Sequence, residues 1–265
     1  MVYLEYDIAE ALKPFVKVIW SMESDSPMLD GTPMHILPDT CVELVVHFRD
    51  PYKTTYSDNT VSIQHQSMVV AQMKSFIRIQ SCGKTGIIAV RFSALGAYHF
   101  FGIPMNEISN REVSLRNLWP GIAGEIEERV NLAETTDRRA QIIQKYLRLQ
   151  LAKNGYVDKT VDFCVKEIKR AKGQLSISAL TEKAGISSRQ LVRRFDKCIG
   201  LSPKEFVRIT KFIGALDMIN NTKGESLTEI ALTSGYYDQA HFIHDFRKFS
   251  GMNPTEYLSS SNVVY

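Results

Sequence analysis

The stretch GLSPKEF at residues 200–206 and its copy GMNPTEY at residues 251–257 decide the fold of the second half of this 265-residue chain. Glycine, proline and glutamate are identical in the two copies, and Pro203 and Pro254 are 51 residues apart. In each copy a Ser or an Asn directly precedes the proline. This is the usual N-cap followed by the first helical residue, so the sequence predicts that helices begin at Pro203 and Pro254.

The similarity extends upstream of both copies. Phe195 matches Phe246 at the same offset, and Gly185 matches Gly235 at an offset of 50, so the second copy holds one extra residue after its glycine. Each copy predicts a short helix that ends at that glycine and a second helix that ends at Gly200 or Gly251, because glycine tolerates the positive φ of a helix end. The predicted N-caps are Ser176 or Ser178, Ser187 or Ser188, Ser226 and Asp238.

Helix, glycine turn and helix is the layout of a helix-turn-helix, whose second helix enters the major groove of DNA. The alternative is a generic helical repeat that binds protein. The faces opposite the apolar stripes favour DNA, because they hold side chains that bond base edges or neutralise phosphates, with few carboxylates. These side chains are Arg189, Gln190, Arg193, Arg194 and Lys197 in the first copy, and Gln239, His241, His244, Arg247 and Lys248 in the second.

Residues 175–207 followed by residues 226–258 resemble the DNA-binding domain of the AraC/XylS family of transcription regulators. The most specific part is IALTSGYYDQAHF at residues 230–242, continued by FRKFSGMNP at residues 246–254. The resemblance implies that a long helix over residues 203–220 joins the two units. It would direct both recognition helices to successive major grooves, about 34 Å apart, on one face of the DNA.

Carried over by position, the resemblance also implies which side chains contact DNA. His244 stands where the family usually has arginine, so the contact there is expected to be weaker or pH-dependent. The implied base-reading residues are Arg189, Val192, Arg193, Gln239, Ala240, His241 and His244. The implied phosphate contacts are Ser188, Arg194, Lys197, Arg247 and Lys248.

The first half of the chain predicts strands, followed by helices. Five short segments rich in β-branched residues alternate with turn-prone stretches, which suggests a small antiparallel barrel or sandwich. A short helix is expected over residues 95–102, and a helical hairpin over residues 122–152 with a break at residues 134–137. The expected strands cover residues 16–20, 42–48, 67–73, 76–80 and 86–92.

Residues 35–45 and 90–104 resemble the cupin-related N-terminal domain of some family members. This implies a ligand pocket in the barrel, for which we expect Trp20, His35, Asp39, Glu43 and Arg91 as lining residues. Asp39 and Glu43 lie on one face if the segment is a strand. The alternative is that Asp39 forms a structural turn after Pro38.

No catalytic residue, metal site or cofactor is predicted. His35, His47, His65 and His99 form no H-x-H pair, so we interpret them as polar or pocket-lining residues. Phosphate-loop, nucleophile-elbow and Rossmann motifs are absent from the sequence. The four cysteines form no C-x-x-C pair, and Cys41 and Cys82 are interpreted as buried structural thiols in preference to redox sensors.

The charge is uneven along the chain. Residues 151–265 hold 17 basic and 12 acidic residues, whereas residues 1–150 have a net charge of −2. A sensor fused to a DNA-binding domain accounts for this asymmetry, although a chance difference between two domains also would. The N-terminus lacks a signal-peptide pattern and no apolar run is long enough to span a membrane, so we expect a cytoplasmic protein without a membrane partner.

The sequence therefore predicts an α+β protein with two domains. Residues 1–153 form a cupin-like β-barrel sensor with a helical connector, and residues 154–265 form an all-α tandem helix-turn-helix domain. The expected function is sequence-specific transcription regulation by a monomer or homodimer. Its expected partners are double-stranded DNA, RNA polymerase and an unidentified small-molecule effector. The alternatives are a barrel enzyme localised to DNA, a constitutive regulator without a ligand, and a protein-interaction module.

Overall fold

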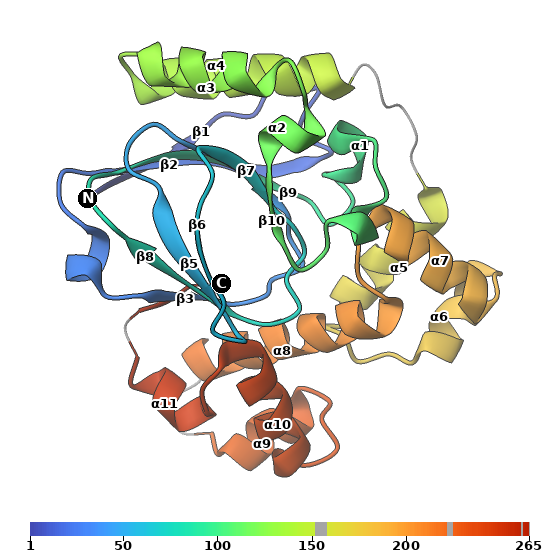
Figure 1. Ribbon diagram of the computed structural model, residues 1–265. Helices are drawn as coiled ribbons and strands as arrows, with labels where there is room; N and C mark the ends of the chain where they lie inside the picture. Colours follow the sequence, from blue (N-terminus) through green and yellow to red (C-terminus); the bar gives the residue numbers. More distant parts are fainter. Residues whose placement is uncertain (152–157, 222–224, 261, 265) are drawn as a thin grey trace.

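The computed structural model describes residues 1–151, 158–221, 225–260 and 262–264. Two β-sheets form the centre of the N-terminal half, helices cover one side of them, and the C-terminal helices lie on the other sides (Figure 1). The expected domain boundary at residues 153 and 154 lies outside the described residues. None of the described helices combines the length and the apolar character that crossing a bilayer requires.

The described strands form two sheets. The larger sheet has the order β1-β2-β9-β4-β7-β10, and the smaller sheet has the order β11-β3-β8-β5-β6. The larger sheet consists of β1 (Val2–Tyr6), β2 (Val16–Ser24), β9 (Thr85–Phe92), β4 (Glu43–His47), β7 (Ser67–Val70) and β10 (Glu112–Ser114). The smaller sheet consists of β11 (Val263–Val264), β3 (Met34–Ile36), β8 (Ile77–Ser81), β5 (Tyr52–Tyr56) and β6 (Val61–Ile63).

The alternation of side chains along β4 separates two cores. Leu44 and Val46 are buried in the core that faces the helices, whereas Val45 is buried between the two sheets. The expected barrel is thus an open pair of facing sheets, since the backbone pairing among the described strands does not continue from one sheet into the other. All five expected strand segments are present within a few residues of their expected bounds.

Helices cover the outer face of the larger sheet. The helix α1 (Tyr98–Phe101) ends at Gly102, whose φ of 67° is left-handed, as expected. The predicted hairpin is α3 (Ala123–Leu132) and α4 (Thr136–Leu151), and its break at residues 133–135 overlaps the expected break at residues 134–137. The remaining short elements on this side are the 3₁₀ helix η2 (Met105–Glu107) and the helix α2 (Leu115–Leu118).

The C-terminal half contains the two predicted helix pairs and the long helix between them. The N-caps are Ser176, Ser187, Ser226 and Asp238, and each accepts a hydrogen bond from a backbone amide in the first turn of its helix. The described helices are α5 (Lys159–Arg170), α6 (Ile177–Ala184), α7 (Ser188–Cys198), α8 (Pro203–Asn221), α9 (Leu227–Thr233), α10 (Gln239–Ser250) and α11 (Pro254–Leu258).

Gly200 and Gly251, which begin the two repeated motifs, pack against the N-terminal half. Gly200 has φ 86°, and a Cβ at that position would lie 2.8 Å from the carbonyl oxygen of Met105. Gly251 has φ 75°, and a Cβ there would clash with the ring of Phe76. These glycines therefore serve both as helix ends and as points of close approach between the two halves.

The two halves also share a sheet. The strand β11 follows the last helix of the chain and pairs in parallel with β3, so that Val263 lies beside His35 and Val264 beside Ile36. The amide of His35 donates a hydrogen bond to the carbonyl oxygen of Asn262 at 2.8 Å. The separation into two domains at one boundary is therefore incomplete, because the end of the C-terminal half belongs structurally to the N-terminal sheet.

Candidate nucleic-acid interface and ligand cavity

The first helix pair presents a polar face on α7. Leu191 and Phe195 are fully buried against the rest of the C-terminal core. Because helix faces repeat every 3.6 residues, the opposite side of α7 is exposed. The exposed residues include most of those expected to contact DNA, namely Ser188, Arg189, Val192, Arg193 and Lys197.

Arg194 differs from these exposed residues. Its guanidinium lies 3.1 Å from the carboxylate of Asp158, which is buried and is the N-cap of α5. The same carboxylate accepts hydrogen bonds from the amides of Thr160 and Val161. Arg194 therefore neutralises a buried charge that begins a neighbouring helix, in addition to any contact with DNA.

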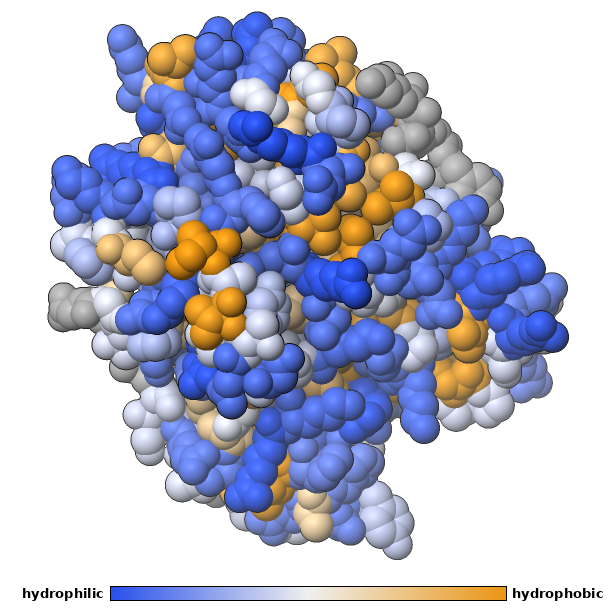
Figure 2. Space-filling model, viewed as in Figure 1, coloured by the Kyte–Doolittle hydropathy of each residue, from blue (hydrophilic) through white to orange (hydrophobic). Residues whose placement is uncertain are grey.

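A groove of about 1000 Å³ runs along the exposed face of α7. Arg189, Val192 and Arg193 form one wall, and Pro104 and Asn106 from the N-terminal half form part of the other. The surface on this side of the molecule, at the right of Figure 2, is mostly hydrophilic. The N-terminal half thus lies directly beside the helix that is expected to read bases.

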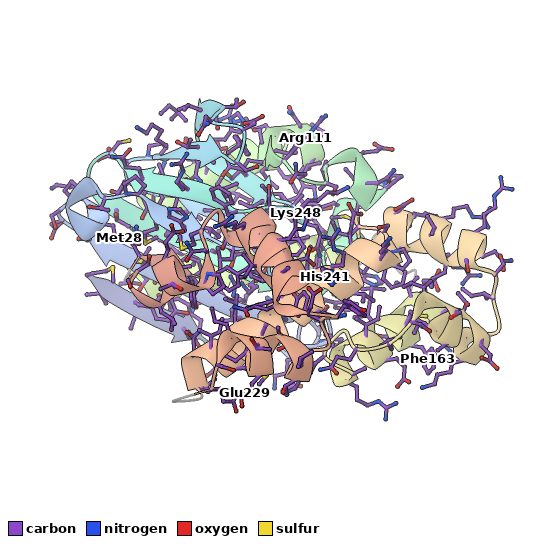
Figure 3. The ribbon with its side chains drawn as sticks, turned by 90° about the horizontal axis from the view of Figure 1, so that it is seen from below. Met28, Arg111, Phe163, Glu229, His241 and Lys248 are labelled. Carbon is purple, nitrogen blue, oxygen red and sulfur yellow. The ribbon has the colours of Figure 1, made fainter. Side chains whose placement is uncertain are left out.

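The second helix pair repeats this arrangement on α10. Phe242 and Phe246 are fully buried, whereas Ala240, His241 and His244 are exposed, together with Arg247 and Lys248. His241 and Lys248 are labelled on this helix in Figure 3. Gln239 is half-buried, and its side-chain oxygen accepts a hydrogen bond from the hydroxyl of Thr228 at 2.9 Å. This bond joins the beginning of the recognition helix to α9.

An ion pair fixes α10 to the long helix α8. Arg208 forms two hydrogen bonds with the buried carboxylate of Asp245, one of them 3.2 Å from Nε to Oδ2. This interaction raises the pKa of Arg208. The rings of His241 and His244 approach the same carboxylate at 4.0 Å and 3.5 Å. A bidentate arginine–carboxylate pair has a defined geometry, so this pair fixes the orientation of α10 relative to α8.

A cavity of about 700 Å³ lies between the two sheets. Of the five residues expected there, Trp20, Glu43 and Arg91 line it. His35 does not, because its ring stacks on Phe76 at 5.6 Å between the centroids, and Asp39 does not, because it lies in a turn before β4. Its other lining residues are mainly apolar and include Met22, Met28, Met34, Val45, Met68, Ile79 and Ile87. Val264 of β11 also lines this cavity.

Arg91 joins the two acidic residues that were expected in the pocket. Its Nε lies 2.9 Å from Glu43, and its terminal nitrogen lies 3.3 Å from Asp39. Asp39 also accepts a hydrogen bond from the amide of Cys41 at 2.9 Å, which is the predicted turn. Burial raises the pKa of Glu43, while the guanidinium of Arg91 opposes this effect. The turn interpretation of Asp39 therefore holds. Asp39 precedes β4 and does not line the cavity, so it meets Glu43 only through Arg91.

Sequence reasoning named His47 among the polar or pocket-lining histidines but missed Gln64 and Glu112, which lie with it at the other end of the cavity. His47, Gln64 and Glu112 all line it, and they come from β4, a loop and β10. Only His47 had a signal in the sequence, because it lies on the same face of β4 as Glu43 and Val45. One interpretation was wrong: Cys41 is buried, but Cys82 is exposed in the turn between β8 and β9, where no core is available to it. Within the described ranges, three or more potential metal ligands never come together.

Two capped helix pairs, a shared long helix and outward-facing basic and amide side chains define a tandem helix-turn-helix protein, a class that binds DNA. Residues 180–260 match a family model described as a helix-turn-helix domain, and residues 5–114 match a domain of unknown function, DUF6597. Over 108 residues the chain is 30% identical to the XylDLEGF operon transcriptional activator 2 of Pseudomonas putida, covering 40% of this chain and 67% of that protein. The chain belongs to the AraC/XylS family of transcription regulators.

Other similar proteins differ in how much of their length is matched. The regulator MtrA of Neisseria gonorrhoeae is 29% identical over 39% of this chain, and the match spans only about a third (34%) of MtrA itself. The solved structure of ToxT from Vibrio cholerae aligns over 90% of this chain and 98% of ToxT, with 11% identity and a TM-score of 0.49.

Proposed function

We propose that this protein binds DNA sequence-specifically through α7 and α10 and regulates transcription in response to a ligand in the N-terminal cavity. The observation that supports DNA binding best is the pair of capped helices, each of which buries one apolar stripe and exposes basic and amide side chains on the other face. The long helix α8 and the Arg208–Asp245 ion pair hold the two helices in one rigid unit.

The exposed residues divide into two groups by chemistry. Arginine, glutamine and histidine side chains near the beginnings of the recognition helices form hydrogen bonds with base edges. Apolar side chains there contact the methyl group of thymine. We assign Arg189, Val192, Arg193, Gln239, Ala240, His241 and His244 to base reading. Ser188, Lys197, Arg247 and Lys248 are assigned to phosphate contacts, with Arg194 in a secondary role because it already pairs with Asp158.

Control by a ligand is supported by the position of β11. Val264 lines the cavity and belongs to a strand that follows directly from the second helix-turn-helix unit. A ligand that shifts this wall changes the free energy of the contact between the two halves. Couplings of this kind are typically about 1–3 kcal/mol, which corresponds to about a 5- to 150-fold change in DNA affinity. We expect RNA polymerase as a further partner at the promoter.

The test begins with selection of binding sites from random double-stranded DNA by the purified full chain. We expect an enriched sequence with two half-sites about one helical turn apart, and an affinity that falls steeply as salt concentration rises. The double variant Arg189→Ala with Arg193→Ala is expected to lose preference for the first half-site only. An unselective chain, or a double variant with unchanged preference, would refute the assignment of α7.

A further inference from the structure

The cavity between the sheets combines an apolar body with one polar end. Five methionines, Met1, Met22, Met28, Met34 and Met68, lie in its wall with branched aliphatic side chains. Its volume of about 700 Å³ is in the range of small-molecule sites. Methionine is flexible and polarizable, so such a wall adapts to apolar ligands of different shape. The few polar side chains must therefore determine which ligand is accepted.

A chain of hydrogen bonds at the polar end fixes the orientation of Gln64. The hydroxyl of Thr54 donates to Glu112 at 2.8 Å, so the oxygen of Thr54 is left to accept. The side-chain nitrogen of Gln64 donates to Thr54 at 3.0 Å and to Glu112 at 2.9 Å. Its side-chain oxygen consequently faces His47, with 3.0 Å between this oxygen and Nε2.

This orientation determines where the proton of His47 lies. An amide oxygen only accepts hydrogen bonds, so Nε2 of His47 must donate, and Nδ1 of the neutral ring is an acceptor. The ring is only 1% exposed, and burial lowers the pKa of His47 to about 4, so it is neutral near pH 7. Nδ1 is buried and has no hydrogen-bond partner in the described structure. An acceptor in this state is stabilised by any donor that reaches it.

The charges around the cavity oppose a negative ligand. Arg91 is already shared between Glu43 and Asp39. Glu112 accepts hydrogen bonds from Thr54, Tyr56 and Gln64. Among the described residues, it forms no ion pair with a cationic side chain. Among the described side chains that line the cavity, Glu43 and Glu112 are carboxylates and only Arg91 is cationic, so bringing in another carboxylate is unfavourable.

We propose that the cavity selects a largely apolar molecule whose polar end donates a hydrogen bond to Nδ1 of His47, as an alcohol or an amine does, and that it discriminates against carboxylic acids. Only the role of this molecule as the effector rests on the proposed function. Binding is tested without DNA, so failure here leaves the DNA-binding assignment unaffected.

The experiment compares four probes with one apolar body: 4-phenyl-1-butanol, 4-phenylbutylamine, 4-phenylbutyrate and butylbenzene. Dissociation constants for the full chain are measured by calorimetry at pH 7.5. We expect the alcohol, the amine or both to bind at least about tenfold more tightly than the butyrate and than butylbenzene. The amine should bind more tightly than the alcohol if the carboxylate of Glu112 contacts the ligand directly. The alcohol should bind more tightly if the hydrogen bond to Nδ1 contributes most. Butyrate binding as tightly as the better of these two probes would overturn the proposal.

Variants test whether His47 causes the preference for the alcohol over butylbenzene. The variant His47→Phe keeps a ring of similar size but removes the acceptor, so the alcohol and butylbenzene should bind within about twofold of each other. The matched control is His65→Phe, since His65 is exposed and does not line the cavity. An undiminished preference in folded His47→Phe would contradict the assignment. The four-probe comparison on the unaltered chain decides the ligand class even if this variant does not fold.

Discussion

The backbone amide of Leu37 donates a hydrogen bond to the carbonyl oxygen of Val264 at 2.9 Å. The two residues are at opposite ends of the chain, yet they lie in neighbouring segments of one sheet. Since Val264 also lines the cavity, the end of the C-terminal half forms part of the wall of this cavity. Events in the cavity and at the recognition helices therefore share a structural element.

This shared strand predicts a protection pattern in hydrogen exchange. Deleting residues 262–265 removes the acceptors of the His35 and Leu37 amides, so both amides should exchange at least about tenfold faster. The amide of Val90 in β9 serves as the internal control and should stay protected, because β9 pairs with β2 and β4 only. Unchanged exchange at His35 and Leu37 would show that β11 does not pair in solution.

Substitutions on α7 should separate base reading from phosphate binding. Arg193→Ala should weaken binding to the selected site by about 5- to 150-fold and relax the preference at one base pair, because a bidentate contact to guanine contributes about 1–3 kcal/mol. Lys197→Ala should weaken all sequences equally and lower the salt slope by about 1. Arg148→Ala is the control, since Arg148 is exposed and belongs to α4, a helix that lies apart from α7 in Figure 1. Equal effects of the first two variants on every sequence would argue against base reading by Arg193.

The groove beside α7 makes the N-terminal half a neighbour of bound DNA. Asn106 is exposed on the wall opposite Arg189 and Arg193. A negative charge at Asn106 repels phosphates and a positive charge attracts them, so Asn106→Asp should lower DNA affinity and Asn106→Lys should raise it, each about threefold to tenfold at low salt. Both differences should shrink as salt increases. Equal affinities at low salt would show that the N-terminal half moves away from α7 when DNA binds.

The helical half was predictable because its signals are local. Caps, glycine ends and proline starts depend on a few neighbouring residues, so Ser187, Asp238 and Pro254 are recognisable without any tertiary information. The exposed face of α7 followed from the helical period for the same reason. The hydrogen bond between Arg194 and Asp158 could not be predicted in this way, because it joins residues 36 positions apart that meet only after their helices have packed.

The N-terminal half was less predictable because sheets depend on distant pairing. The strands β3 and β6 have three residues each, which is too short for an alternating pattern to stand out. The strand β11 has two residues and exists only because β3 offers it an edge. The polar end of the cavity combines residues from positions 47, 64 and 112, whose proximity arises from tertiary structure alone.

The Arg194–Asp158 pair predicts a stability defect that is separate from DNA binding. Arg194→Met keeps much of the side chain but leaves the buried carboxylate of Asp158 without its cation, so the free energy of unfolding should fall by about 1–3 kcal/mol. Denaturant titration measures this change. DNA affinity of the folded variant should stay within about threefold of the unaltered chain. A stable variant with strongly reduced DNA affinity would instead support a direct phosphate contact by Arg194.

The buried state of His47 predicts how stability depends on pH. Its pKa is about 4 in the folded chain and near its ordinary value of 6.5 in the unfolded chain, so between these values only the unfolded chain binds the proton. The contribution of this residue to the free energy of unfolding is therefore complete above pH 6.5 and is lost as pH falls toward 4, by about 3 kcal/mol in total. Other groups titrate in the same range, so the informative quantity is the difference between the unaltered chain and His47→Phe, which cannot take up this proton. Denaturant titrations from pH 7.5 to 4.5 should show this difference nearly constant down to about pH 6.5 and then decreasing as the pH is lowered further, whereas His65→Phe should follow the unaltered chain. A difference that is constant over this range would mean that His47 is as accessible to protons in the folded chain as in the unfolded one, which its burial among Gln64, Tyr52 and the cavity wall does not allow.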